Sequence, residues 1–164
     1  MGPTPAALSL GMPSIVAIFG FVLLAGAALA GASAQAQFAA APQRQKLAVL
    51  QPSDAANPKA YRIDAARHIY DAYPAQILKG KVPALVYAIV VTETEIDARG
   101  KVLKVRVLRQ PASAREVTPW VVSMIRRASP LPPPARIGRV KFVEVWLVDR
   151  SGQFQVHSLT EGQL

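Results

Sequence analysis

The pattern of apolar and polar positions predicts a helix near the middle of the chain. Its apolar face consists of residues that recur every four positions: Tyr61, Ala65, Ile69 and Tyr73. Asn57 offers an N-cap, with Pro58 at the first helical position. Pro74 ends the segment, because the residue before a proline is pushed out of the α region. His68 lies off the apolar face, so we expect it on the solvated surface.

A second helical stripe follows about fifty residues later. Its apolar positions are Val117, Trp120, Val121, Met124, Ile125 and Ala128. Two starts fit this stripe: the capping-box pattern of residues 113–116, or Thr118 followed by Pro119. The proline-rich stretch 129–134 is incompatible with a helix, so we expect an extended tie that runs over the domain.

Four stretches are typical of strands. Residues 82–96 are rich in β-branched side chains, and residues 101–109 alternate after an Asp-x-x-Gly turn at 97–100. If Ile96 pairs with Lys101, the antiparallel hairpin places Thr94 opposite Leu103 and Val90 opposite Val107, with both apolar sets on one face. Residues 140–148 form a third predicted strand and residues 153–159 a fourth, weaker one. A second Asp-x-x-Gly turn joins them.

The order of these elements is helix, strand, strand, helix, strand, strand. We therefore predict an α+β fold with an antiparallel sheet of three or four strands and two helices packed on one face. The predicted domain covers residues 61–164. Residues 37–60, rich in Ala, Gln and Pro, are interpreted as a flexible linker.

The first part of the chain has the features of an export segment. Residues 1–36 contain no Asp, Glu, Lys or Arg, and residues 15–31 are uninterrupted apolar and small residues. Small residues at 32–36 permit signal cleavage after Ala34 or Ala36. The alternative is an uncleaved anchor helix over residues 15–32. Both interpretations place the rest of the chain in the periplasm.

Composition narrows the chemistry. The net charge is +9, which outside the cytoplasm favours acidic proteins or anionic lipid over nucleic acid as partners, or else only a solvated surface. The chain has no Cys and only two His, far apart, so we expect no metal and no cofactor. Common hydrolase motifs are absent, and Glu93 and Glu95 are interpreted as surface residues. We therefore expect no enzymatic activity.

Residues from about 69 to 163 resemble the TonB C-terminal domain family, which is structurally related to TolA. The resemblance is carried by Tyr73-Pro74, Gly80-Lys81-Val82, residues 96–102, residues 126–130 and residues 158–163. It implies a TonB C-terminal-like fold that binds outer-membrane proteins by strand addition, in which a partner's short segment pairs with a sheet edge.

The resemblance also implies a site and partners. The edge is the third strand, with Val143, Glu144, Val145, Trp146 and Leu147 as partner-binding residues. Tyr73 and Pro74 flank the groove. The competing interpretation is that Trp146 belongs to the core and that the fourth strand covers residues 143–147. The implied partners are an outer-membrane TonB-dependent transporter or another periplasmic protein. Apart from the resemblance, an open edge strand also permits pairing with a second copy of this chain.

Three departures from TonB bear on energy transduction. Residues 15–32 contain no His, the predicted linker reaches roughly 80 Å at full extension, and Tyr70-Asp71-Ala72 replaces a Gln-containing stretch. We therefore predict a periplasmic binding protein of Gram-negative bacteria. The alternative is an inner-membrane-anchored energy transducer that works with an ExbB/ExbD-type motor.

Overall fold

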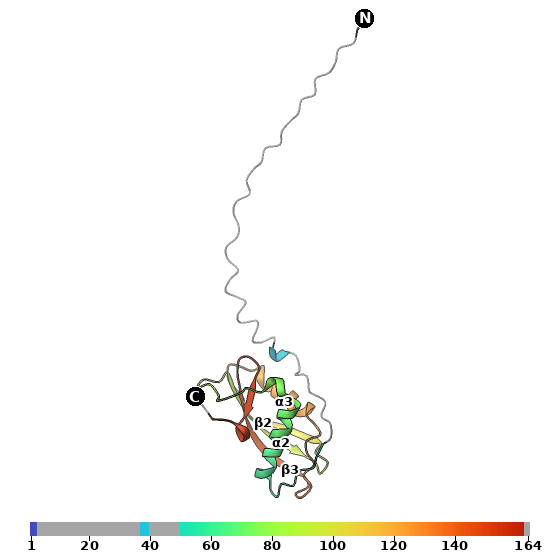
Figure 1. Ribbon diagram of the computed structural model, residues 1–164, viewed down its shortest axis with the longest axis vertical. Coiled ribbons are helices and arrows are strands. Elements are labelled where there is room, and N and C mark those ends of the chain that lie inside the picture. The colour runs from blue at the N-terminus through green and yellow to red at the C-terminus, as the bar shows by residue number, and fades with distance from the viewer. Residues whose placement is uncertain (3–36, 40–49, 163–164) are drawn as a thin grey trace.

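A computed structural model describes residues 1–2, 37–39 and 50–162 (Figure 1). Four antiparallel strands form one sheet in the order β2-β1-β3-β4. Their bounds are β1 Ala88–Ile96, β2 Val102–Arg109, β3 Val140–Val148 and β4 Phe154–Val156. Helices α2 (Pro58–Ala72) and α3 (Val117–Arg127) share one buried core with the same face of the sheet. The predicted α+β class with an antiparallel sheet of three or four strands is therefore confirmed, and the observed sheet has four.

Two short 3-10 helices, η1 (Pro74–Gln76) and η2 (His157–Leu159), follow α2 and β4. In the part of the chain that the structure describes, no helix has the length and apolar composition needed to cross a bilayer. The predicted signal or anchor segment lies outside the described residues.

Helix α2 forms for the reasons that the sequence gives. The Asn57 side chain accepts a hydrogen bond from the Ala60 amide at 2.9 Å, and Pro58 follows it as the first helical residue. The predicted apolar face is buried. The expectation for His68 was wrong: it is 6% exposed, and its Nε2 lies 2.8 Å from the carbonyl oxygen of Ala128. This carbonyl at the end of α3 gives a polar side chain a partner inside the core.

Helix α3 buries its predicted stripe but begins differently. Its first residue is Val117, and the N-cap Glu116 makes no side-chain capping bond, so neither predicted start is correct. The Glu116 carboxylate instead accepts a hydrogen bond from the Tyr87 hydroxyl at 2.6 Å. A tertiary partner has replaced the local cap.

The stretch after α3 joins separate parts of the domain. The Leu131 amide donates to the carbonyl of Gly100 at 2.8 Å. The Tyr61 hydroxyl donates to the carbonyl of Pro132 at 2.7 Å, and the Ser53 amide to that of Pro133 at 2.9 Å. The stretch thus fixes the first turns of α2 to the β1–β2 turn.

Part of the predicted linker also packs on the domain. Ser53 forms an isolated parallel β-bridge with Pro134 and is 4% exposed. Phe38 is 6% exposed, stacks on Tyr87 with 6.0 Å between ring centroids, and meets Trp120 edge-on at 5.2 Å. Among the described residues, ordered structure therefore begins before residue 61.

The β1–β2 hairpin has a different register from the predicted one. The observed pairs are Ile96 with Val102, Thr94 with Val105 and Thr92 with Val107. Two register shifts leave Leu103 and Leu108 as additional residues in β2, and they are 46% and 48% exposed. A bulge reverses the alternation of side chains, so strict alternation assigned Leu103 to the wrong face.

The remaining strands follow the prediction more closely. Strand β3 has the predicted bounds, whereas β4 is shorter than predicted and turns into η2. Strand β1 begins at Ala88, six residues later than predicted. Both Asp-x-x-Gly turns form: Asp97 accepts a hydrogen bond from the Gly100 amide at 3.0 Å, and Asp149 from that of Gly152 at 3.1 Å.

Candidate functional site

Strand β3 is paired unequally on its two sides. On one side β1 pairs with all nine of its residues, without a register shift. On the other side β4 pairs only with Trp146, Leu147 and Val148. Among the described residues, no strand therefore pairs with the β4-side edge of residues 141–145. We call these five residues the free edge of β3.

The direction of the backbone groups on β3 follows from its short pairing with β4. The Phe154 carbonyl accepts a hydrogen bond from Leu78, and the Val156 amide donates to the Tyr70 hydroxyl, so both point away from β3. Gln155, between them, must then face Leu147.

Alternation along β3 extends this result to the free edge. If Leu147 faces β4, then the amides and carbonyls of Val145, Val143 and Lys141 point to the same side. Those of Phe142 and Glu144 point toward β1. Among these edge groups, the Val145 amide has a side-chain acceptor, Glu144 Oε1 at 3.0 Å. Residues 141 and 143 thus present backbone groups at the open end of the edge.

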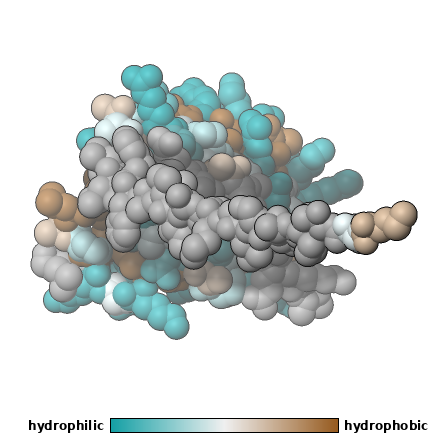
Figure 2. Space-filling view, turned by 90° about the horizontal axis from the view of Figure 1, so that it is seen from above, coloured by the Kyte–Doolittle hydropathy of each residue, from teal (hydrophilic) through white to brown (hydrophobic). Residues whose placement is uncertain are grey.

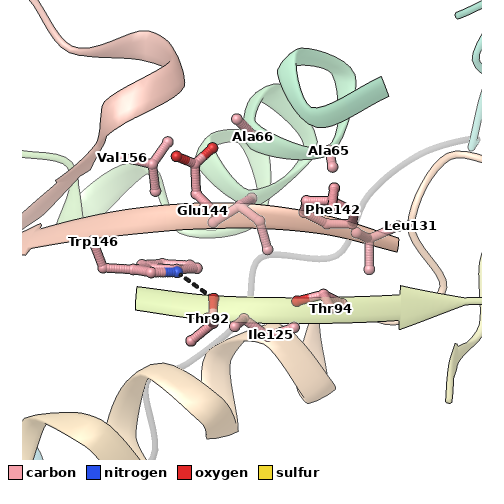
Figure 3. Close-up of a pocket in the computed structure, with 11 residues that line it drawn as sticks. Ala65, Ala66, Thr92, Thr94, Ile125, Leu131, Phe142, Glu144, Trp146 and Val156 are labelled. Atoms are coloured by element: carbon pink, nitrogen blue, oxygen red, sulfur yellow. Dashed lines mark hydrogen bonds between the residues drawn. The ribbon is translucent and has the colours of Figure 1, made fainter. Parts of the chain in front are cut away.

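Glu144 closes the other end of the free edge. Its side chain is 4% exposed and lies between Val156 and Ala66 of α2 (Figure 3). The carboxylate accepts hydrogen bonds from the Ser158 amide at 3.3 Å and from the Ser158 hydroxyl, in addition to the bond from Val145. It therefore ties η2 to β3 where β4 ends.

The first turn of α2 lies next to the free edge. A surface cavity of about 210 Å³ separates the two elements. Its lining residues come from α2, β1 and β3: Pro58, Lys59, Arg62, Glu93, Lys141, Phe142 and Val143. Val143 is 39% exposed, whereas Phe142 packs its ring on Tyr61 with centroids 5.6 Å apart. An extended segment along the edge would meet this cavity.

The interior behind the edge is packed and partly polar. Residues from both helices and from β1 and β3 surround a small cavity of about 10 Å³, which is close to the space of one water molecule (Figure 3). The Trp146 indole donates to the Thr92 hydroxyl at 3.0 Å across it. The side chains of β3 on this face are thus held in the core behind its edge.

Charged side chains surround the open end of the edge. Glu93 pairs with Arg106 at 3.3 Å, and Glu95 pairs with Arg139 and with Lys141, the latter at 3.6 Å. The hydrogen bond from Arg139, opposed by partial burial, holds the pKa of Glu95 below its ordinary value. In the view from above, hydrophilic side chains and smaller apolar patches alternate on the described surface (Figure 2).

The sheet has a second open edge on β2. There the amides of Val105 and Val107 point away from β1, by the same alternation. Two bulges interrupt this strand, and Lys104, Arg106 and Arg109 lie along it. Bulges and basic residues are devices that prevent pairing at edge strands, so the regular β3 edge is the better template.

The structure separates the residues that the sequence placed at one site. Val143, Glu144 and Val145 belong to the free edge. Trp146 is 2% exposed and belongs to the core, and Leu147 pairs with β4. For these two residues, the competing interpretation of a core residue and a strand covered by β4 therefore fits. The third strand is therefore not an outer strand of the sheet, although part of one side is open.

The two predicted groove residues lie elsewhere. Tyr73 is fully buried, and its hydroxyl donates to the Met124 carbonyl at 3.0 Å. Pro74 begins η1, at the opposite end of α2 from the cavity. Lys59 and Arg62, which line the cavity, were not predicted from the sequence. Their signal was their position on the polar side of the predicted helix, which does not reveal a neighbouring strand.

Comparisons with protein-family models, with curated proteins and with solved structures found no match for this chain. Within the described ranges, no group of three or more His, Cys, Asp or Glu side chains is placed to hold a metal ion. The geometry of the free edge is therefore the main evidence on function.

Proposed function

We propose that this protein is a periplasmic binding protein that binds an extended segment of a partner protein by strand addition to the free edge of β3. One observation carries this proposal: β3 pairs regularly with β1 over nine residues, yet β4 covers only three of them. The backbone of the open part supplies hydrogen-bonding groups in the strand geometry that such recognition uses.

The surroundings of the edge support an intermolecular role. A flat strand with an unpaired edge is a hazard for aggregation unless it is covered or used. On β2, bulges and basic residues interrupt the outer edge, but the β1–β3 register has no bulge. The cavity beside Val143 adds a place for one partner side chain. A stable template next to a cavity is what strand addition needs.

The resemblance to the TonB C-terminal domain family suggests the partner. On that basis we propose an outer-membrane transporter whose N-terminal segment faces the periplasm. The resemblance also supports the proposed location outside the cytoplasm, together with the apolar segment 15–31.

The test uses the exported chain and synthetic peptides from the N-terminal segments of outer-membrane transporters. Backbone amide shifts are followed by nuclear magnetic resonance during the titration. The proposal predicts that the largest changes fall within residues 141–145, at Lys141 and Val143, because their amides point to the open side where a new strand would bond.

A pair of proline variants separates this edge from the other one. Val143→Pro removes an edge amide without touching a bond to β1, and should abolish binding. Val107→Pro makes the same change on the outer edge of β2, and should leave binding intact. Far-ultraviolet circular dichroism shows whether each variant is folded. Loss of binding in both folded variants, or shifts centred on β2, would contradict the proposal.

A further inference from the structure

We infer that the free edge of β3 selects an extended segment that carries an acidic side chain, which the cavity between α2 and β3 receives. This inference rests on the proposed strand addition and adds the chemical class of the partner. It is carried by the charges around the cavity and by the two basic residues of α2 that line it.

The open end of the edge has an excess of positive charge. The cavity and its neighbouring ion pairs contain five basic residues and two acidic ones: Lys59, Arg62, Arg106, Arg139 and Lys141 against Glu93 and Glu95. Glu93 is neutralised by Arg106, and Glu95 is shared by two cations. Among the described residues, Lys59 and Arg62 have no ion-pair partner.

Arg62 is the most informative of these residues. Its Nε atom is buried and has no hydrogen-bond partner within the described structure. This nitrogen is shielded from solvent, but Arg62 lines the cavity, and a carboxylate is the group that matches its guanidinium best. A carboxylate in the cavity would pair with this guanidinium and also meet the charge of Lys59, one turn earlier on α2.

The register of the edge fixes where the acidic residue belongs. Val143 lines the cavity, and its amide points to the side where a partner strand would lie. The partner residue that pairs directly with Val143 therefore places its side chain on the same face of the sheet as Val143, beside the cavity. Residues of the partner near Leu147 would meet β4 instead.

The experiment uses three synthetic Val/Thr peptides of about eight residues, a length that exceeds an average strand of ~5–6 residues. They differ at one central position, which is Glu, Gln or Lys. Affinity is measured by calorimetry with the full exported chain, and amide shifts report the site. We expect the Glu peptide to bind roughly fivefold or more tightly than the Gln peptide, which corresponds to one charge pair at ~4 Å in water. The Lys peptide should be weakest.

Variants of α2 assign the preference to the cavity. Arg62→Gln and Lys59→Gln should each reduce the preference for Glu over Gln. Arg67→Gln is the matched control, because Arg67 lies on the same helix, pairs with Asp64 and does not line the cavity. If Arg62→Gln does not fold, Lys59→Gln carries the test. High salt should also weaken the preference.

The outcomes distinguish this inference from the proposed function. If all three peptides shift residues 141–145 with equal affinity, strand addition stands and the acidic preference is refuted. If no peptide shifts these residues, the proposed function fails with it. A Glu preference that survives Lys59→Gln and Arg62→Gln would place the selective contact elsewhere and overturn the assignment to this cavity.

Discussion

Gly100 offers a direct test of how the domain holds α2 above the β3 edge. It has φ +82° in the β1–β2 turn, and a Cβ atom built on it would lie 1.8 Å from the carbonyl oxygen of Leu131. Next to Leu131, the carbonyl of Pro132 accepts a hydrogen bond from the hydroxyl of Tyr61 in the first turn of α2. The perturbation is Gly100→Ala.

The magnitude has three parts. A left-handed conformation costs alanine about 1–2 kcal/mol. The contact with Leu131 forces its backbone to move, which breaks the 2.8 Å bond from its amide to Gly100, worth about 1 kcal/mol. Leu131 is 1% exposed, so its displacement also loses part of about 1.5–3 kcal/mol of burial. We therefore expect Gly100→Ala to destabilise the fold by about 3–6 kcal/mol.

Gly152 is the matched control. It occupies the same position in the second Asp-x-x-Gly turn, at φ +78°, but its Cβ would meet no atom closer than 3.7 Å. Gly152→Ala should cost only the conformational part, about 1–2 kcal/mol. Urea unfolding followed by the fluorescence of the buried Trp120 and Trp146 measures both. Equal destabilisation of the two variants would refute the close approach of Leu131 to the β1–β2 turn.

Three further predictions concern other contacts. Tyr61→Phe removes the bond to Pro132 and should lower the free energy of unfolding by about 1 kcal/mol, measured by urea titration. Phe38→Ala should change Trp120 fluorescence and cost about 1.5–3 kcal/mol, and an unchanged spectrum would mean that Phe38 is not docked. The pKa of Glu95 is lowered, so its ionised form favours the folded state above the unfolded pKa, and this stability is lost as pH falls through the folded pKa. The urea midpoint of Glu95→Gln should therefore fall less than that of the parent between neutral and acidic pH.

Much of the fold follows from local patterns. The apolar stripes of both helices, the bounds of β3 and both Asp-x-x-Gly turns depend on residues close in sequence, and the structure confirms them. Periodicity and turn chemistry encode such features directly.

The errors come from tertiary contacts that no local pattern contains. The carbonyl of Ala128 gives the buried His68 a hydrogen-bond partner inside the core. The hydroxyl of Tyr87 donates to the carboxylate of Glu116, which therefore does not cap α3. Bulges at Leu103 and Leu108 shift the register without any Gly or Pro signal.

The candidate site was only partly predictable for the same reason. The sequence selected the strand on which the structure leaves an open edge, but the extent of that edge depends on where β4 stops. That end is marked by the bond from Ser158 to Glu144, two residues that are fourteen positions apart. The position of Lys59 and Arg62 beside this edge depends on the packing of α2 against β3.

Residue-resolved amide hydrogen exchange of β3 tests the central claim most directly. For the protein without peptide, we predict fast exchange at Lys141 and Val143 and slow exchange at Phe142 and Glu144, which bond to β1. Saturation with a transporter peptide should slow Lys141 and Val143 and leave the other two unchanged. Two results would show that the edge of β3 is not the binding site. One is that the Val143 amide is as protected as that of Glu144 without a peptide, and the other is that its exchange rate is the same with and without the peptide.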